Sequence, residues 1–341
     1  MRTSSKKLVL WMCLALLICA VLGILVGAVR VPFNDFITVL RCKLTGASLP
    51  SGLVGTEKIL FSLRIPRTLL MILTGAALAC SGASYQGLFR NPLADPYLIG
   101  ISSGAGLGAV IAMSIRWPYT RLGTFMTPIF SFVFALLAVA IVFNLGRMGG
   151  YLNITGLILA GVAVNAFASA ATSAYMLLNG DDLKRSFSWM LGGGRVSGWD
   201  AVLIAAPLIL ISIAGQIRWA YPLDILQFGD DQARQLGIDI YRTRNALIFY
   251  ASLATASAIA FSGVIGFVGL IVPHLLRILM GNDYRKLIPA SCIGGGLFLC
   301  AADILARVLL SPQELPVGIV TAMTGAPFFL WILNRSNKAK V

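Results

Sequence analysis

Few residues in this sequence have the types and spacing that enzyme chemistry needs. The only histidine, His274, has no second metal-ligand candidate at helical spacing, which excludes a zinc-protease site. No G-x-x-x-x-G-K-S/T motif is present, so any ATP hydrolysis has to come from another polypeptide. We therefore predict that the chain is not an enzyme, with no catalytic residue, no cofactor and no metal site.

Asp303 is the only carboxylate placed deep within an apolar run. Arg307 follows it by four residues, so both side chains lie on one helix face and can neutralise each other. An ion-coupled secondary transporter usually keeps several ionisable residues along its path, so this function stays as an alternative, which predicts uptake without an ATPase partner. A membrane-embedded enzyme, such as a lipid-modifying transferase, would need paired carboxylates or histidine clusters at membrane depth, which the sequence lacks.

A first polar cluster is the segment Arg64-Ile65-Pro66-Arg67. Proline suits the first turn of a helix, so we expect both arginines at a helix N-terminus. The partial positive charge there disfavours a cation by about 0.3–1 kcal/mol. Two cations at such a position indicate an anion site. The alternative, that they contact lipid headgroups or anchor the helix by extending to the membrane surface, explains them equally well.

A second polar cluster lies in the loop 218–244. Residues 222–237 are predicted to form two short helices that are broken at Gly229, with apolar and charged residues mixed along them. Such an amphipathic pair can lie on lipid or dock into a protein. The acidic residues Asp224, Asp230 and Asp231 favour a protein, because an anionic membrane surface would repel them.

The composition indicates the elements that must position these clusters. The chain has 341 residues, of which 58% are hydrophobic and 12% charged, whereas a soluble domain carries about 25% charged residues. A transmembrane helix needs about 20 apolar residues, and continuous apolar runs exclude a membrane barrel. We predict one all-α, polytopic permease domain over residues 1–341 with ten spans, at about 8–29, 65–88, 98–115, 122–145, 154–178, 200–217, 245–262, 264–281, 287–310 and 316–334.

The charge balance fits a membrane protein. Lys and Arg number 27 against 13 Asp and Glu, but these cations border the apolar spans, where they set orientation and meet lipid, so we expect no nucleic-acid partner. The run Leu8–Val29 is too long for the apolar part of a signal peptide and is predicted to be the first span. An even number of spans and a weak excess of cations on one side place both termini in the cytoplasm.

Glycine and proline residues add two local expectations. The Gly104-x-x-x-Gly108 pair in the third span favours close packing of helices. The two X-Pro bonds in the segment 91–96 stop helix formation, which predicts a rigid cytoplasmic turn after the second span.

These blocks, in this order, resemble the permease subunits of type II ABC importers, the FecCD-like family that carries iron–siderophores, haem and cobalamin. The resemblance covers the chain from about residue 60 to its end. The matching segments are Leu63–Leu69, Gly75–Gly87, Asn91–Gly108, Leu159–Val162, Ala233–Gly237, Gly263–Arg277, Ala302–Arg307 and Glu314–Leu330.

The resemblance implies the fold and the partners. Family members have ten helices per subunit, pair as a homodimer or close heterodimer, and form the pathway between the two subunits in the bacterial cytoplasmic (inner) membrane. Two ATP-binding subunits dock on cytoplasmic coupling helices, and a substrate-binding protein docks on the opposite side. The cargo is expected to be an iron–siderophore first, and cobalamin or haem next.

The resemblance also implies roles for individual residues. Arg64, Arg67 and Arg307 are expected to receive carboxylates of the binding protein. Asn153, Ile154 and Thr155 are expected at the cytoplasmic gate, and a structural hydrogen bond is a better role for His274 than haem ligation. The residues expected to couple to the ATP-binding subunits are Leu223, Asp224, Leu226, Phe228, Asp230, Asp231, Arg234, Leu236 and Gly237.

Overall fold

The computed structural model describes residues 5–27, 31–118, 120–148, 151–178, 183–194 and 198–338. Apart from the two-residue antiparallel strands β1 (Arg147–Met148) and β2 (Tyr151–Leu152), the described regular structure is helical, which confirms the all-α prediction. The helices are α1 (Ser5–Leu25), α2 (Phe33–Thr45), η1 (Ser51–Leu53), α3 (Val54–Lys58), η2 (Ile59–Arg64), α4 (Ile65–Leu88), η3 (Pro96–Ile99), α5 (Ile101–Ser114), α6 (Arg121–Leu145), α7 (Ile154–Leu178), α8 (Leu183–Met190), α9 (Trp199–Arg218), α10 (Ala220–Leu226), α11 (Asp230–Gln235), α12 (Ile240–Ser262), α13 (Val268–Met280), α14 (Tyr284–Val308) and α15 (Val317–Lys338).

Ten of the described helical segments are apolar enough for a membrane protein. Seven are long enough to cross a bilayer, and three shorter apolar helices lie at Ile101–Ser114, Val268–Met280 and Val317–Leu330. The observed α7 has the predicted bounds, whereas α12 begins five residues before the predicted start at 245. The earlier start follows from Asp239, whose carboxylate caps the helix by accepting a hydrogen bond from the Arg242 amide at 2.9 Å.

Pro66 lies in the first turn of α4, as expected, but the expectation that Arg64 lies at a free helix N-terminus is wrong. α3, the π-helical turn η2 and α4 follow one another without a break, so the helical segment runs from Ser51 to Leu88. A proline within a helix removes one i→i−4 bond, and the wider π turn accommodates this defect, since the Ile65 amide donates to the Leu60 carbonyl five residues back. Arg64 therefore does not lie at a free helix N-terminus.

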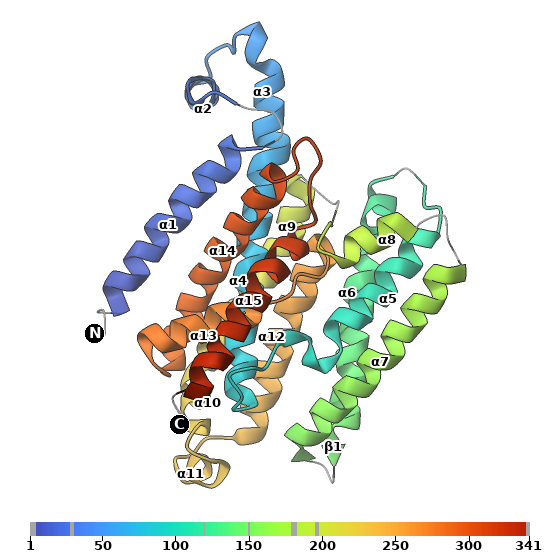
Figure 1. Ribbon diagram of the computed structural model, residues 1–341, viewed down its shortest axis with the longest axis vertical. Coiled ribbons are helices and arrows are strands. Elements are labelled where there is room, and N and C mark those ends of the chain that lie inside the picture. The colour runs from blue at the N-terminus through green and yellow to red at the C-terminus, as the bar shows by residue number, and fades with distance from the viewer. Residues whose placement is uncertain are drawn as a thin grey trace.

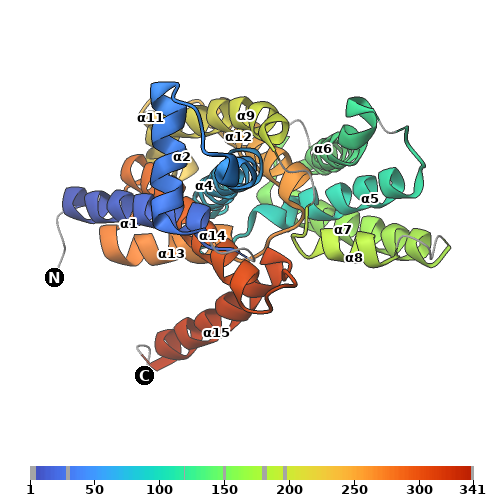
Figure 2. The same ribbon diagram turned by 90° about the horizontal axis from the view of Figure 1, so that it is seen from above.

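α4 lies at the centre of the bundle, with α9, α12, α13 and α14 packed around it, while α5, α6, α7 and α8 form a second group beside them (Figures 1 and 2). The close packing of α4 on α14 depends on glycine. A Cβ atom on Gly75 would collide with the backbone carbonyl of Gly295, and one on Gly295 would collide with that of Gly75. α1 lies at the outside of the bundle, next to α14 (Figure 1).

The chain after α4 makes the turn that the two X-Pro bonds predict. Residues 91–94 turn at the end of α4, but the chain then re-enters the bundle through η3. There the Asn165 side-chain amide, near the middle of α7, donates to the Tyr97 carbonyl at 3.3 Å. The expected packing of the Gly104-x-x-x-Gly108 pair is confirmed, because Cβ atoms at these positions would meet the backbone of Phe134 and Phe130 in α6.

Candidate functional site

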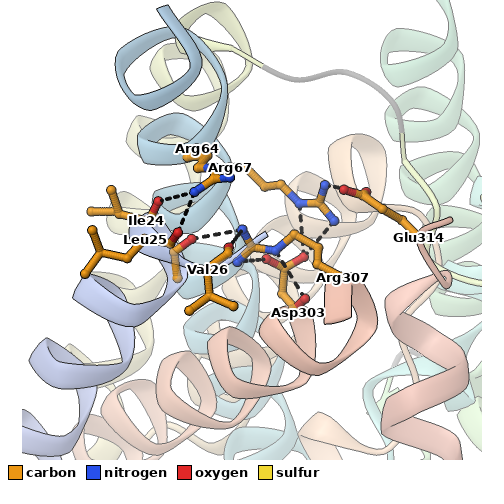
Figure 3. A network of polar contacts seen from close by, with 9 residues as sticks. Ile24, Leu25, Val26, Arg64, Arg67, Asp303, Arg307 and Glu314 are labelled. Atoms are coloured by element: carbon orange, nitrogen blue, oxygen red, sulfur yellow. Dashed lines mark hydrogen bonds and ion pairs between the residues drawn. The ribbon is translucent and has the colours of Figure 1, made fainter. Parts of the chain in front are cut away.

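Arg64 caps the end of α1 (Figure 3). Its Nη1 donates to the carbonyl oxygens of Ile24 and Leu25, at 3.0 and 2.6 Å. The last carbonyls of a helix have no partner within the helix and carry a partial negative charge, so a guanidinium is a favourable ligand for them. The Arg64 side chain is buried by this arrangement.

Arg307 holds the same helix end from α14. Its Nη1 donates to the carbonyl oxygens of Gly23 and Val26, both at 2.9 Å, and its Nη2 lies 2.9 Å from Asp303 Oδ2. The predicted neutralisation of Asp303 by Arg307 is confirmed. Only 3% of the Arg307 side chain is exposed. Since Arg307, like Arg64, is engaged within the chain, a docking carboxylate would have to break these bonds to reach either one.

Arg67 is the most accessible of the three arginines. Its Nε and Nη2 lie 3.0 and 2.9 Å from Asp303 Oδ1, and its Nη1 lies 2.6 Å from Glu314 Oε2 (Figure 3). The exposed fractions of the side chains are 27% for Arg67 and 43% for Glu314. The cluster thus holds three guanidinium groups and two carboxylates, which leaves it one positive charge in excess.

A pocket of 490 Å³ lies beside Arg67. Arg67 and Glu314 line it together with Pro66, Ser188 and the glycine-rich segment 192–194. Sequence reasoning gave Glu314 no role. Its contact with Arg67 joins residues 247 positions apart, and no local pattern in the sequence indicates such a pair.

The opposite end of the bundle carries the two short helices that the sequence predicts around Gly229. α10 and α11 are separated at this glycine, which has a φ of 120°. Leu223 and Leu226 are buried within the chain, so they are not available to a partner, contrary to the expectation. The exposed members of the expected set are Phe228, Asp231, Arg234, Leu236 and Gly237.

Two acidic residues of this loop fix the helices to the rest of the chain. Asp230 Oδ1 lies 2.8 Å from Arg90 Nη2 and 2.9 Å from Arg244 Nη2. Asp224 Oδ1 accepts a hydrogen bond from the Tyr284 amide at 2.6 Å. Burial raises the pKa of Asp224, and this backbone bond opposes the rise. These contacts anchor α10 and α11 to α12, to α14 and to the end of α4. A displacement of the two short helices can therefore be passed to these longer helices.

The expected gate residues lie at the start of α7, after the β1–β2 ribbon. Asn153 caps this helix, and its Oδ1 accepts hydrogen bonds from the amides of Thr155 and Gly156 at 2.9 and 3.3 Å. Thr155 is exposed and Ile154 is half-buried. The structure thus brings the three residues together at one helix end.

The other candidates for chemistry lie apart. His274, in α13, has a buried Nδ1 with no hydrogen-bond partner among the described residues, so the expected structural bond is not seen at this atom. Within the described ranges, no three His, Cys, Asp or Glu side chains come close enough together to hold a metal ion.

The sequence of this chain is similar to those of known proteins. Residues 15–335 match the FecCD transport family. The hemin transport system permease protein HmuU of Yersinia pestis is 41% identical over 282 residues, which cover 82% of this chain and 84% of the relative. The cobalamin import system permease protein BtuC of Halobacterium salinarum is 40% identical over 289 residues, which cover 84% and 77%.

A solved structure is also similar. It is described as an inward-facing conformation of a proposed metal-chelate type ABC transporter. It matches with a TM-score of 0.81 and 28% identity over 97% of this chain and 99% of that one. The sequence match and the fold agree over nearly the whole chain. The chain therefore belongs to the FecCD transport family and is an ABC transporter permease.

Proposed function

We propose that this chain forms the translocation pathway of an ABC importer for a metal chelate. The observation that carries the proposal is the structural likeness to a metal-chelate type ABC transporter over 97% of the chain. ATP binding and hydrolysis are supplied by two separate subunits, and cargo is delivered by a substrate-binding protein outside the membrane. Alternating access then moves the cargo between two permease subunits.

Three cargoes are the candidates. The sequence blocks favour an iron–siderophore, whereas the relatives named for hemin and cobalamin favour those two chelates. All three are large metal complexes. Selectivity in this mechanism resides in the binding protein, and the permease presents a largely inert wall.

The binding protein docks at the end of the bundle that carries α2 and α3. Arg67 receives a carboxylate there, because it is the arginine of the cluster with the largest exposed fraction. Arg64 and Arg307 are buried and do not contact the binding protein. They hold the end of α1 in place and add positive charge to the docking site. Long-range attraction between this charge and an acidic partner speeds association.

The ATP-binding subunits dock at the other end, on α10 and α11. Exposed Phe228 and Leu236 offer apolar contacts, and Asp231 and Arg234 offer charged ones. Asp230 serves as an internal anchor, since two arginines of this chain hold it. Asn153, Ile154 and Thr155 form part of the gate on this side.

The second permease subunit is a copy of this chain or a close relative. α7 and α15 present large exposed apolar side chains, among them Phe167 and Met323, which lipid and the second subunit would cover. The location that follows is a bacterial cytoplasmic membrane, with both termini on the cytoplasmic side. In Figure 1, α1 begins and α15 ends toward the side that carries α10 and α11.

The test is purification of the native complex through a tag on this chain. We expect two ATP-binding subunits and a substrate-binding protein to co-purify, and mass spectrometry to find a metal chelate on the binding protein. A chain that purifies without an ATPase and drives uptake by an ion gradient would establish the secondary transporter instead.

A further inference from the structure

Arg67 divides its hydrogen-bonding atoms between two different carboxylates. Nε and Nη2 face Asp303, which is buried and is shared with Arg307. Nη1 faces Glu314, whose side chain is 43% exposed. The Asp303 side of the guanidinium is therefore fixed, while the Glu314 side is open to exchange.

Glu314 lies where an incoming carboxylate would bind. It borders the 490 Å³ pocket together with Arg67, and Figure 3 shows its side chain reaching the guanidinium from the segment that precedes α15. A carboxylate that enters this pocket can reach Nη1 only by replacing Glu314, because a second anion at the same donor would be repelled by the first.

We propose that Glu314 is an internal competitor that occupies the docking position of Arg67 until the binding protein arrives. Docking then exchanges one carboxylate for another at Nη1. Arg67 stays in place during the exchange, since Asp303 keeps Nε and Nη2. This inference rests on the proposed docking at Arg67 and adds a residue of this chain that sets its affinity.

The exchange also releases one attachment of the segment before α15. Two backbone bonds remain in this segment and in the first turn of α15, from the Leu315 amide to the Ala306 carbonyl at 3.0 Å and from the Gly318 amide to the Leu191 carbonyl at 2.9 Å. The segment would thus stay folded after docking, while the side chain of Glu314 moves away from α4. Docking would loosen the link between α4 and the start of α15.

The size of the effect follows from the exposure of the pair. An ion pair this exposed favours its closed state over the open one by only about two- to five-fold. The apparent affinity of a partly blocked site equals its intrinsic affinity multiplied by the fraction of time that the site is free. We therefore expect Glu314→Gln to tighten the affinity for the binding protein about three- to six-fold, through a faster association rate.

The experiment compares variants of the tagged permease complex in detergent. The probe is the substrate-binding protein that co-purifies with the wild-type complex, titrated against each immobilised variant. Glu57→Gln is the matched control, because it removes the same charge from an exposed ion pair, with Lys43 at 2.6 Å, at the same end of the bundle. Glu314→Gln is also made in an Arg67→Met background, where no guanidinium remains to be freed.

The outcomes separate this inference from the proposed function. We expect a clearly larger gain in affinity for Glu314→Gln than for Glu57→Gln, whose gain reports general charge alone. In the Arg67→Met background we expect no gain from Glu314→Gln beyond that of Glu57→Gln. Equal gains in affinity for both glutamate variants would mean that only the net charge matters, and would overturn the inference. Unchanged or weaker binding of Glu314→Gln would overturn it as well. If the wild-type complex binds no such protein, the proposed docking fails as well.

Discussion

Replacing Arg307 with methionine tests whether this residue holds α1 in place. Methionine keeps an apolar stem of similar length, so the change removes mainly the guanidinium. The two bonds from Nη1 to the carbonyls of Gly23 and Val26 are lost, and Asp303 keeps Arg67 as its one remaining cation among the described residues. α1 is the most exposed of the long spans, so few other contacts compensate.

The expected cost can be worked out from these contacts. Hydrogen bonds between membrane helices contribute about 0.6 kcal/mol on average and about 1.7 at most, whereas bonds from charged donors contribute about 1.5–3 kcal/mol in soluble proteins. Two bonds at about 1–1.7 kcal/mol each, plus a weakened buried ion pair, give a loss of about 3–4 kcal/mol in the free energy of unfolding.

The assay is unfolding of the purified permease in mixed micelles, together with hydrogen exchange of the amides at the end of α1. Arg285→Met is the matched control, since Arg285 is exposed and we expect its replacement to leave the unfolding curve unchanged. The double variant Asp303→Asn, Arg307→Met should recover about 1–2 kcal/mol, because it also removes the buried charge. A loss below about 1 kcal/mol for Arg307→Met, or a double variant less stable than the single one, would refute the capping role.

Three further changes separate docking, coupling and packing. Arg67→Met should lower the affinity for the binding protein at least about ten-fold, with a smaller loss of stability than Arg307→Met, because the Arg67 side chain is partly exposed and Asp303 keeps Arg307. A titration and an unfolding curve measure the two effects. Phe228→Ala should weaken binding of the ATP-binding subunits without loss of stability, whereas Leu223→Ala should cost about 2–5 kcal/mol, since Leu223 is fully buried; the reverse order would contradict the assignment of surfaces. Gly75→Val should prevent accumulation of folded permease in membranes, because its side chain would collide with the Gly295 carbonyl; normal expression by immunoblot would show that the contact is not required.

The fold could be predicted from the sequence because its main signals are local. Apolar runs indicate the spans, and charged residues or glycines mark where they end. The break between α10 and α11 at Gly229 is of this kind, since a residue with a φ of 120° favours glycine. Which side of such short helices is buried depends on contacts with α4 and α14, so the burial of Leu223 and Leu226, which were expected to contact the ATP-binding subunits, could not be predicted.

The cluster of Arg64, Arg67 and Arg307 was only half predictable. The resemblance to importer permeases implies a shared role for the three arginines, but their partners are far away along the chain. Backbone carbonyls at the end of α1 carry no sequence signature, and Glu314 lies 247 positions from Arg67. The position of Arg64 was misinterpreted because a proline after a π turn and a proline at a helix start have the same local sequence.

Reconstitution in sealed vesicles tests most directly whether this chain depends on other proteins for energy and for cargo. The permease is inserted alone, or together with its ATP-binding subunits and the loaded binding protein, and uptake of haem, cobalamin or a ferric siderophore is followed with ATP on the cytoplasmic side. We expect accumulation against the gradient only with the complete set and ATP. Accumulation by the permease alone, driven by a proton or sodium gradient, would contradict this mechanism.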